Sequence, residues 1–185
     1  MHSNVLCLFV VLMASAAHVV AQSADSTTRY DVAVGYAFMR DQDIAANNPD
    51  ISANFSAGWM ASAGVNLSSW FGAAGEVSGH YKTIAIPGDQ PKVRVYAYLA
   101  GPRVRHTFGR ISPFGQVLFG AAHASTSVLS ATDATTKFSY QPGGGVEAHL
   151  SPGVGIRFEG DFRIIRSDGA NSKEPGFAVA AVFGF

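Results

Sequence analysis

The chain of 185 residues has a single cysteine, Cys7, and that residue lies in the apolar stretch at the amino terminus. The rest of the chain therefore has neither disulfides nor thiolate metal sites. Charge is also scarce, since 14% of the residues are charged, against about 25% in a typical soluble domain. The 13 basic and 13 acidic residues cancel, which argues against a nucleic acid partner. Beyond the amino terminus, no apolar run reaches the roughly 18 residues that a transmembrane helix needs.

The amino terminus has the pattern of a secretory signal peptide. An uncharged apolar core runs from Val5 to Ala17, and Val19-Val20-Ala21 offers small residues for cleavage before Gln22. The usual Lys or Arg before the core is missing, and only His2 stands there. A retained membrane anchor is the alternative, but the apolar core is short for one. We expect a signal peptide over 1–21 and one mature domain over 22–185.

The last ten residues, 176–185, alternate between two kinds of side chain. The even positions are small, apart from Val182, and successive strand residues face opposite sides of a sheet. Ten strand residues at about 45° of tilt cross a bilayer. The segment resembles the signal that the outer-membrane assembly machinery recognises. Its apolar face carries Phe177, Val179, Ala181, Phe183 and Phe185. The buried last strand of a soluble sandwich is the alternative.

The same alternation recurs along the chain and predicts eight strands. In one of them Phe55, Trp59 and Val65 share a face opposite Ser56 and Gly58. The connections between the strands are long and short in turn, as in outer-membrane barrels with short periplasmic turns and long extracellular loops. Prolines remove a ladder donor, so we expect bulges or local pairing defects at Pro102 and Pro142. The predicted strands span 30–38, 55–67, 71–82, 93–105, 114–123, 138–150, 154–165 and 176–185. We therefore predict an all-β fold, an eight-stranded antiparallel up-and-down transmembrane β-barrel.

If the aromatic face meets lipid, the opposite faces of the strands must hold the charged residues. In Val154–Arg163, for example, Ile156 and Phe158 face outward while four charged residues face inward. Each of those charges would cost about 2–4 kcal/mol at mid-bilayer, and inside the barrel acids and bases must pair. We therefore predict an ion-pair network that plugs the lumen and disfavours open-pore conduction. Its members are Glu76, Arg103, Arg105, Glu147, Arg157, Glu159, Asp161 and Arg163. Asp31, His80, Gln116 and His149 have the same inward parity.

Catalytic interpretations are weaker. The carboxylates could act as acids and bases, but a lumen filled with arginines leaves no cleft for a substrate. His123 and Ser125 share a strand face and could form a hydrolytic triad with an acid. This His-x-Ser resembles that of outer-membrane lipid A deacylases, but Ala122 stands where that family has Asn, and only Asp133 follows in a loop. The run Gly143–Gly145 precedes no helix and is not a phosphate loop. We predict no enzyme activity, no cofactor and no metal site.

Two segments resemble the fourth and fifth strands of the family related to the outer-membrane protein A transmembrane domain. They are Tyr98-Leu-Ala-Gly-Pro-Arg103 and Ile111-Ser-Pro-Phe-Gly-Gln-Val-Leu-Phe-Gly-Ala-Ala-His123, and the terminal Phe185 matches as well. The resemblance covers about 30 to 185 and implies a barrel in the outer membrane.

The resulting hypothesis is a monomeric outer-membrane protein with a structural or surface-interaction role. It would contact outer-membrane lipid, the assembly machinery and a possible extracellular partner, the last through the loops Arg40–Asn54 and Ala124–Lys137. One alternative is a barrel hydrolase of the lipid A deacylase type that uses His123 and Ser125. A second is a secreted soluble β-barrel that binds an apolar ligand.

Overall fold

The computed structural model describes residues 29–42, 54–83, 92–128, 131–166 and 171–184. The predicted signal peptide, the centre of the predicted loop Arg40–Asn54 and Phe185 lie outside these residues. The strands are β1 (Tyr30–Arg40), β2 (Asn54–Phe55), β3 (Ala57–Asn66), β4 (Phe71–Thr83), β5 (Lys92–Arg105), β6 (Ile111–Val128), β7 (Ala131–Ser151), β8 (Val154–Arg166) and β9 (Asn171–Gly184). No helix among the described residues is long and apolar enough to cross a membrane.

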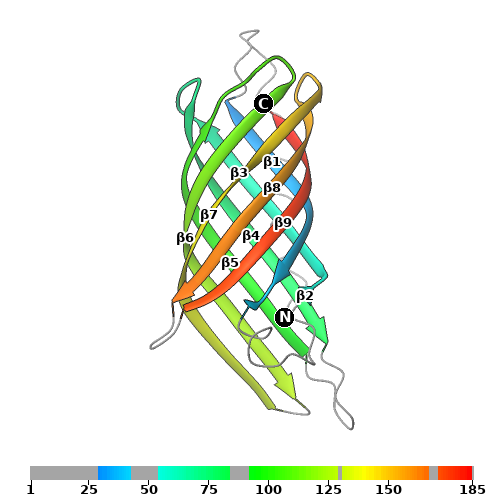
Figure 1. The fold of residues 1–185 in the computed structure, drawn as a ribbon, viewed down its shortest axis with the longest axis vertical. Coiled ribbons are helices and arrows are strands. Elements are labelled where there is room, and N and C mark those ends of the chain that lie inside the picture. The colour runs from blue at the N-terminus through cyan, green and yellow to red at the C-terminus, as the bar shows by residue number, and fades with distance from the viewer. Residues whose placement is uncertain (1–28, 43–53, 84–91, 129–130, 167–170, 185) are drawn as a thin grey trace, which may run out of the picture.

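The strands form one closed antiparallel barrel (Figure 1). From β3 onward each strand pairs with the next in sequence, and β1 pairs with β9 from Asp31↔Gly184 to Met39↔Gly176. The short β2 and the longer β3 both pair with β1 and together occupy one position in the wall. The predicted eight-stranded transmembrane barrel is therefore confirmed.

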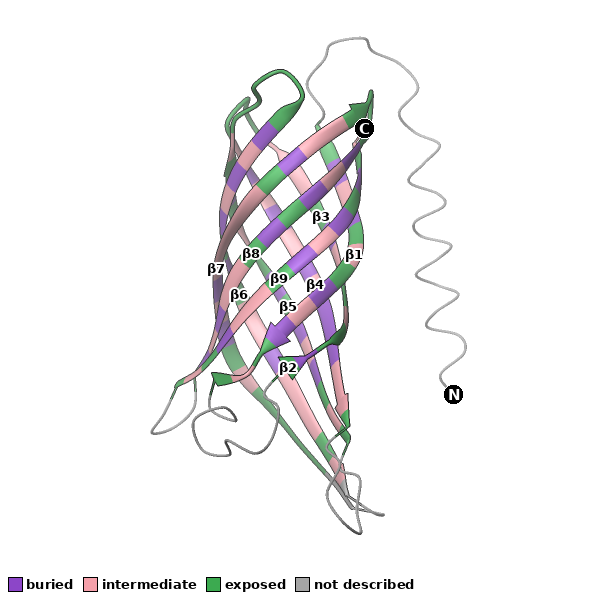
Figure 2. Ribbon diagram, turned by 45° about the vertical axis from the view of Figure 1, so that its right-hand side comes forward, coloured by how far each residue is buried: buried purple, intermediate pink, exposed green. Residues whose placement is uncertain are grey.

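Burial alternates along the strands, as Figure 2 shows by its bands of colour. Large apolar side chains are exposed on the outer surface, and charged side chains are buried inside. This arrangement suits a wall between lipid and a polar interior. The exposed set includes Tyr30, Val34, Tyr36, Trp59, Trp70, Tyr98, Phe119, Phe138, Phe158, Phe177 and Phe183.

The predicted outward orientation of Phe55 is wrong. Tyr36 pairs with Trp59, whereas Met39 pairs with Phe55. Three steps along β1 thus match four steps along its neighbour, so one extra residue is accommodated around Ser56. A bulge of this kind reverses which side chains face the interior. Phe55 is consequently buried, with 1% of its surface exposed.

Two predicted loops are largely strand. The segment Ala124–Lys137 continues β6 to Val128 and β7 from Ala131, in a ladder that ends at Val128↔Ala131. The paired ends of these two strands extend beyond the rest of the wall, at the end opposite the C-terminus (Figure 1). Likewise β9 begins at Asn171, whereas the last predicted strand begins only at 176, so part of the predicted connection 166–175 is strand.

The two strand prolines interrupt ladders without changing the register. Between β5 and β6 the recorded pairs pass from Ala100↔Phe119 to Arg103↔Gln116, skipping Pro102. Between β7 and β8 they pass from Tyr140↔Ile164 to Gly143↔Asp161, skipping Pro142. The predicted pairing defects are present, whereas the only recorded register shift in these ladders lies elsewhere, between His149 and Ser151.

The short turns all lie at the end of the barrel where the C-terminus lies (Figure 1). They are 67–70, 106–110 and 152–153. Gly109 and Gly153 have φ of 59° and 75°, a backbone conformation that glycine adopts most readily. Since short turns are periplasmic in outer-membrane barrels, we refer to this end as the periplasmic end.

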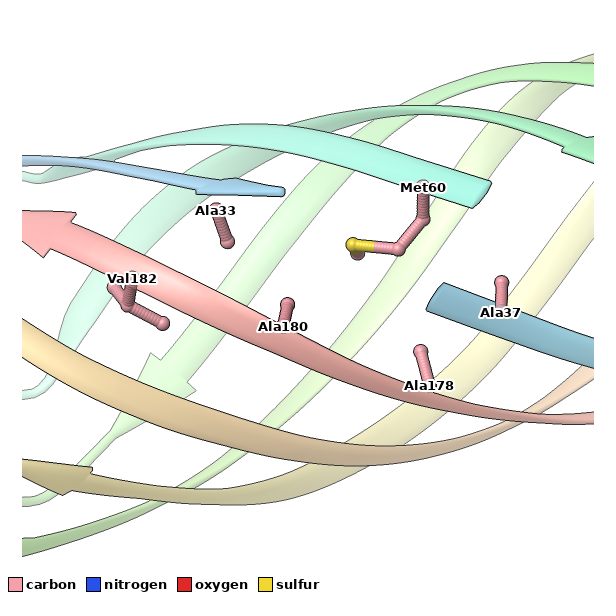
Figure 3. Packing of buried hydrophobic residues seen from close by; sticks show 6 residues of the cluster. All are labelled: Ala33, Ala37, Met60, Ala178, Ala180 and Val182. Carbon is pink, nitrogen blue, oxygen red and sulfur yellow. The ribbon is translucent and has the colours of Figure 1, made fainter. Parts of the chain in front are cut away.

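Small side chains line part of the interior next to the closing seam. Ala33, Ala37, Ala178, Ala180 and Val182 project inward from β1 and β9, and Met60 joins them from β3 (Figure 3). They leave room for the long polar side chains of the other strands.

Candidate functional site: the polar interior

Asp31 of β1 is the acceptor at the centre of a buried cluster near the periplasmic end. Its Oδ1 lies 3.0 Å from Nη1 of Arg103 on β5 and 3.0 Å from Nη2 of Arg157 on β8. Arg157 also donates to Glu147 of β7, from Nε at 2.9 Å and from Nη2 at 2.5 Å. Charge-assisted bonds of this length are the strong kind. The cluster therefore cross-links strands on different sides of the barrel.

Neutral groups complete this cluster. Arg157 Nη1 donates to Ser62 Oγ at 2.9 Å, and Arg103 Nε donates to Gln116 Oε1 at 2.9 Å. The Gln116 amide in turn donates to Glu159 Oε1 at 2.5 Å. Both guanidinium groups lie over the Phe114 ring, at 5.4 and 5.1 Å from its centroid, which adds a cation–π contribution.

A second cluster, closer to the extracellular end, surrounds Arg163 of β8. Its Nε donates to Gln141 Oε1 at 2.8 Å, and its Nη2 donates to Ser78 Oγ at 2.9 Å. Nη1 lies 3.8 Å from Glu174 Oε2. The Gln141 amide also donates to Glu76 Oε1 at 3.1 Å, so the glutamine links the arginine to a second carboxylate.

Apolar side chains lie beyond the second cluster, toward the extracellular end of the barrel. Met39, Phe55 and Val95 form a buried group, with Val93 and Ala124 packed against it. The Lys82 Nζ lies 5.3 Å from the centroid of the Phe55 ring. We call Met39, Phe55 and Val95 the apolar cap.

One small cavity lies between these layers. A cavity of about 10 Å³ lies among Met60, Glu76, His80, Asp161 and Arg163, which is room for about one water molecule. Among the described residues, no three His, Cys, Asp or Glu side chains are placed to hold a metal ion.

The comparison with known families follows from this architecture. Residues 7–185 match the sequence model of the outer membrane protein beta-barrel domain. The chain belongs to this family. The predicted location in the outer membrane is thereby confirmed, and the soluble secreted barrel considered above is wrong.

Solved structures support the fold. The attachment invasion locus protein Ail of Yersinia pestis is 16% identical, with 86% of this chain and 100% of that chain covered and a TM-score of 0.59. The same protein in complex with the heparin analogue sucrose octasulfate is 18% identical, with 85% of this chain and 98% of that chain covered and a TM-score of 0.61. Neisserial surface protein A is 12% identical, with 86% of this chain and 98% of that chain covered and a TM-score of 0.63. A search of curated proteins finds no match to the chain.

The structure distributes the eight predicted network residues over several contacts. Arg103, Arg157 and Glu147 belong to the first cluster, while Arg163 and Glu76 belong to the second. Glu159 joins the first cluster through Gln116. Of the remaining two, Arg105 lies 3.9 Å from both Asp31 and Glu147, and Asp161 lines the small cavity.

Sequence reasoning missed several members of these clusters. Asp31 has the predicted inward parity, but its central role depends on which strands face each other across the lumen. Glu174 lay in a predicted loop. The inward parity of Ser62, Ser78 and Gln141 could have identified them, since polar residues at such positions have few other partners.

The pair His123 and Ser125 lies on the outer side of the wall. Both share the parity of Val117 and Phe119, which are exposed, and His123 Nδ1 is 2.8 Å from Thr136 Oγ1. Asp133 follows the parity of the buried Ser139 and Gln141 and therefore lies on the opposite face of the hairpin. The three side chains do not form the arrangement that a triad requires.

Proposed function

We propose that this protein is a monomeric, structural outer-membrane barrel whose lumen is plugged and which acts through its extracellular surface. The observation that carries the proposal is the filled interior. Two hydrogen-bonded clusters and the apolar cap occupy the interior, and the cavity described among them measures about 10 Å³. A lumen filled in this way is typical of eight-stranded barrels and offers no continuous water path for ions.

Ion conductance in planar lipid bilayers tests the plug. We expect the purified protein to insert without a steady open current. Replacing long inward side chains by short ones, in Arg163→Ser with Gln141→Ser, should raise the conductance because water then fills their space. Val117→Ala is the matched control on the outer surface and should change nothing. A steady porin-like current through the unmodified protein would contradict the proposal.

A second observation favours contact with an anionic extracellular partner. The ends of β6 and β7 project beyond the wall, and β5 places two exposed basic residues beside them, since Lys92 pairs with Ser127 and Arg94 with Ser125. The similar protein Ail has been crystallised with a heparin analogue. We propose a sulfated or otherwise anionic glycan as the partner of this surface.

Binding of a fluorescent heparin oligosaccharide to the protein in micelles tests this second candidate. The substitutions Lys92→Ala and Arg94→Ala together should weaken binding about tenfold and flatten its salt dependence, because exposed charges act through screened attraction. Arg29→Ala, at an exposed arginine that precedes β1 at the periplasmic end, is the control. Equal binding by all variants would refute the surface.

A further inference from the structure

A continuous apolar groove runs along the outer wall from the periplasmic rim. Its first part, about 350 Å³, lies among Trp70, Val104, Pro113 and Gly115. Its second part, about 400 Å³, continues among Gly115, Val117 and the two prolines Pro102 and Pro142. Because Val104 and Gly115 line both parts, we treat them as one feature, the wall groove.

Gly115 keeps the wall groove open. A Cβ atom built at this position would meet only Val104 Cγ2 at 3.8 Å and Gly143 O at 4.0 Å, which are ordinary van der Waals distances. The missing side chain is therefore empty space rather than space occupied by a neighbour. The groove also passes Pro102 and Pro142, which lie beside the two interrupted ladders.

At its periplasmic end the wall groove meets a cationic concavity, which we call the mouth. The mouth measures about 610 Å³ and is framed by the three short turns. Arg105 and His106 line both the groove and the mouth. Arg110 and His149 line the mouth as well, and its described wall residues include no Asp or Glu.

The two arginines of the mouth, Arg105 and Arg110, make no carboxylate contact shorter than 3.9 Å among the described residues. Arg105 lies 3.9 Å from each of the carboxylates of Asp31 and Glu147, which make their shorter contacts with other arginines. Among the described residues, Arg110 has no carboxylate in ion-pairing range. The His106 ring contacts Phe108 edge-on at 4.4 Å between centroids, which fixes its position at the junction.

An apolar channel that ends at cationic donors matches one class of molecule, an amphiphile with an anionic head. We propose that the wall groove and the mouth together bind one anionic phospholipid of the periplasmic leaflet. An acyl chain lies in the groove beside Gly115, and the phosphate is bound by Arg105, His106 and Arg110. Guanidinium groups suit phosphate oxygens because their donors form a planar fork. The groove opens on the lipid-facing wall, so the chain never leaves the hydrocarbon.

The two tryptophans of the chain provide the measurement. Trp70 lines the groove, whereas Trp59 lies toward the opposite end of the wall and donates to the Tyr81 hydroxyl at 3.0 Å. In a Trp59→Phe protein in neutral micelles, a brominated phosphatidylglycerol should quench Trp70 fluorescence along a saturating curve. Arg110→Ala with His106→Ala should raise the half-saturating lipid fraction about tenfold, and Gly115→Val should abolish saturation by filling the groove.

Control measurements separate the proposal from its competitors. In a Trp70→Phe protein, Trp59 should show quenching that rises only in proportion to the lipid fraction, and Arg94→Ala should leave the Trp70 curve unchanged. Each variant is first checked for folding by its migration in an unboiled gel. Proportional quenching of Trp70, or saturation unaffected by Gly115→Val, would overturn the proposal. Displacement of the lipid by inorganic phosphate alone would also overturn it, since the mouth would then bind the anion without the chain.

Discussion

At the residue scale, the interior depends on charges that cannot be left alone. Arg157 is 1% exposed and forms ion pairs with two carboxylates, those of Asp31 and Glu147. Replacing it by an apolar side chain would leave Glu147 with only Arg105 at 3.9 Å, and Asp31 with Arg103 as its one close partner, in a medium that solvates carboxylates poorly. Removing the arginine alone is therefore costly, even if the cluster as a whole adds little to the free energy of unfolding.

We predict that Arg157→Met lowers the free energy of unfolding by about 3–5 kcal/mol, the usual cost of breaking a buried ion pair. Urea titration in lipid vesicles, followed by tryptophan fluorescence, measures it. Arg94→Met, an exposed arginine on β5, should change stability by less than about 0.5 kcal/mol. Restoring part of the loss by adding Glu147→Gln would support the electrostatic cause, while equal effects of both arginine substitutions would argue against it.

The sequence could assign most interior residues because parity is a local property. Glu147 and Arg157 alternate with exposed Val146 and Phe158, so their orientation follows from the neighbours. Their partners do not follow in the same way. Asp31 contacts Arg103, 72 positions away in the sequence, and Arg157, 126 positions away. Whether such distant residues meet depends on how the barrel closes and on its stagger, which alternation does not encode.

At the element scale, the outer faces of the strands must tolerate lipid. Val34 lies in the middle of β1, is 50% exposed and pairs with Ala181 of the closing strand. Leu67 is exposed to a similar degree but follows β3 at the periplasmic end. These two positions differ in depth rather than in exposure.

We predict that Val34→Arg destabilises the folded barrel by about 2–4 kcal/mol, whereas Leu67→Arg costs about 0–1 kcal/mol, since the penalty depends on depth in the bilayer. Unfolding titrations in vesicles of the same lipid compare the two. Similar costs at both positions would show that the bilayer does not lie where the barrel geometry places it.

Element boundaries could be predicted only where the strands face lipid. Ala124–Lys137 lacks apolar alternation because its strands have left the wall, so no face requires large apolar side chains. Its threonines still favour extended backbone, and β6 and β7 remain paired to Val128 and Ala131. The orientation of Phe55 was unpredictable for another reason: a bulge changes parity without any mark in the apolar pattern.

At the scale of the whole molecule, closure by β1 and β9 removes every sheet edge along the shared wall. Such a barrel resists detergent because its backbone donors and acceptors are satisfied within the wall. We predict faster migration of unboiled than boiled protein on a detergent gel. Boiling should abolish the difference by separating the strands, and identical migration would indicate that the closed barrel does not persist in detergent.

The Asp31 cluster also constrains the order of events during folding. Its charged members come from β1, β5, β7 and β8, so its bonds cannot all form before the wall has nearly closed. Until then Asp31 keeps its own hydration shell, whereas Arg157 can already contact Glu147 on the neighbouring strand. The release of water from Asp31 and the pairing of β1 with β9 therefore belong to one cooperative step, which completes a cluster that neighbouring strands can only begin.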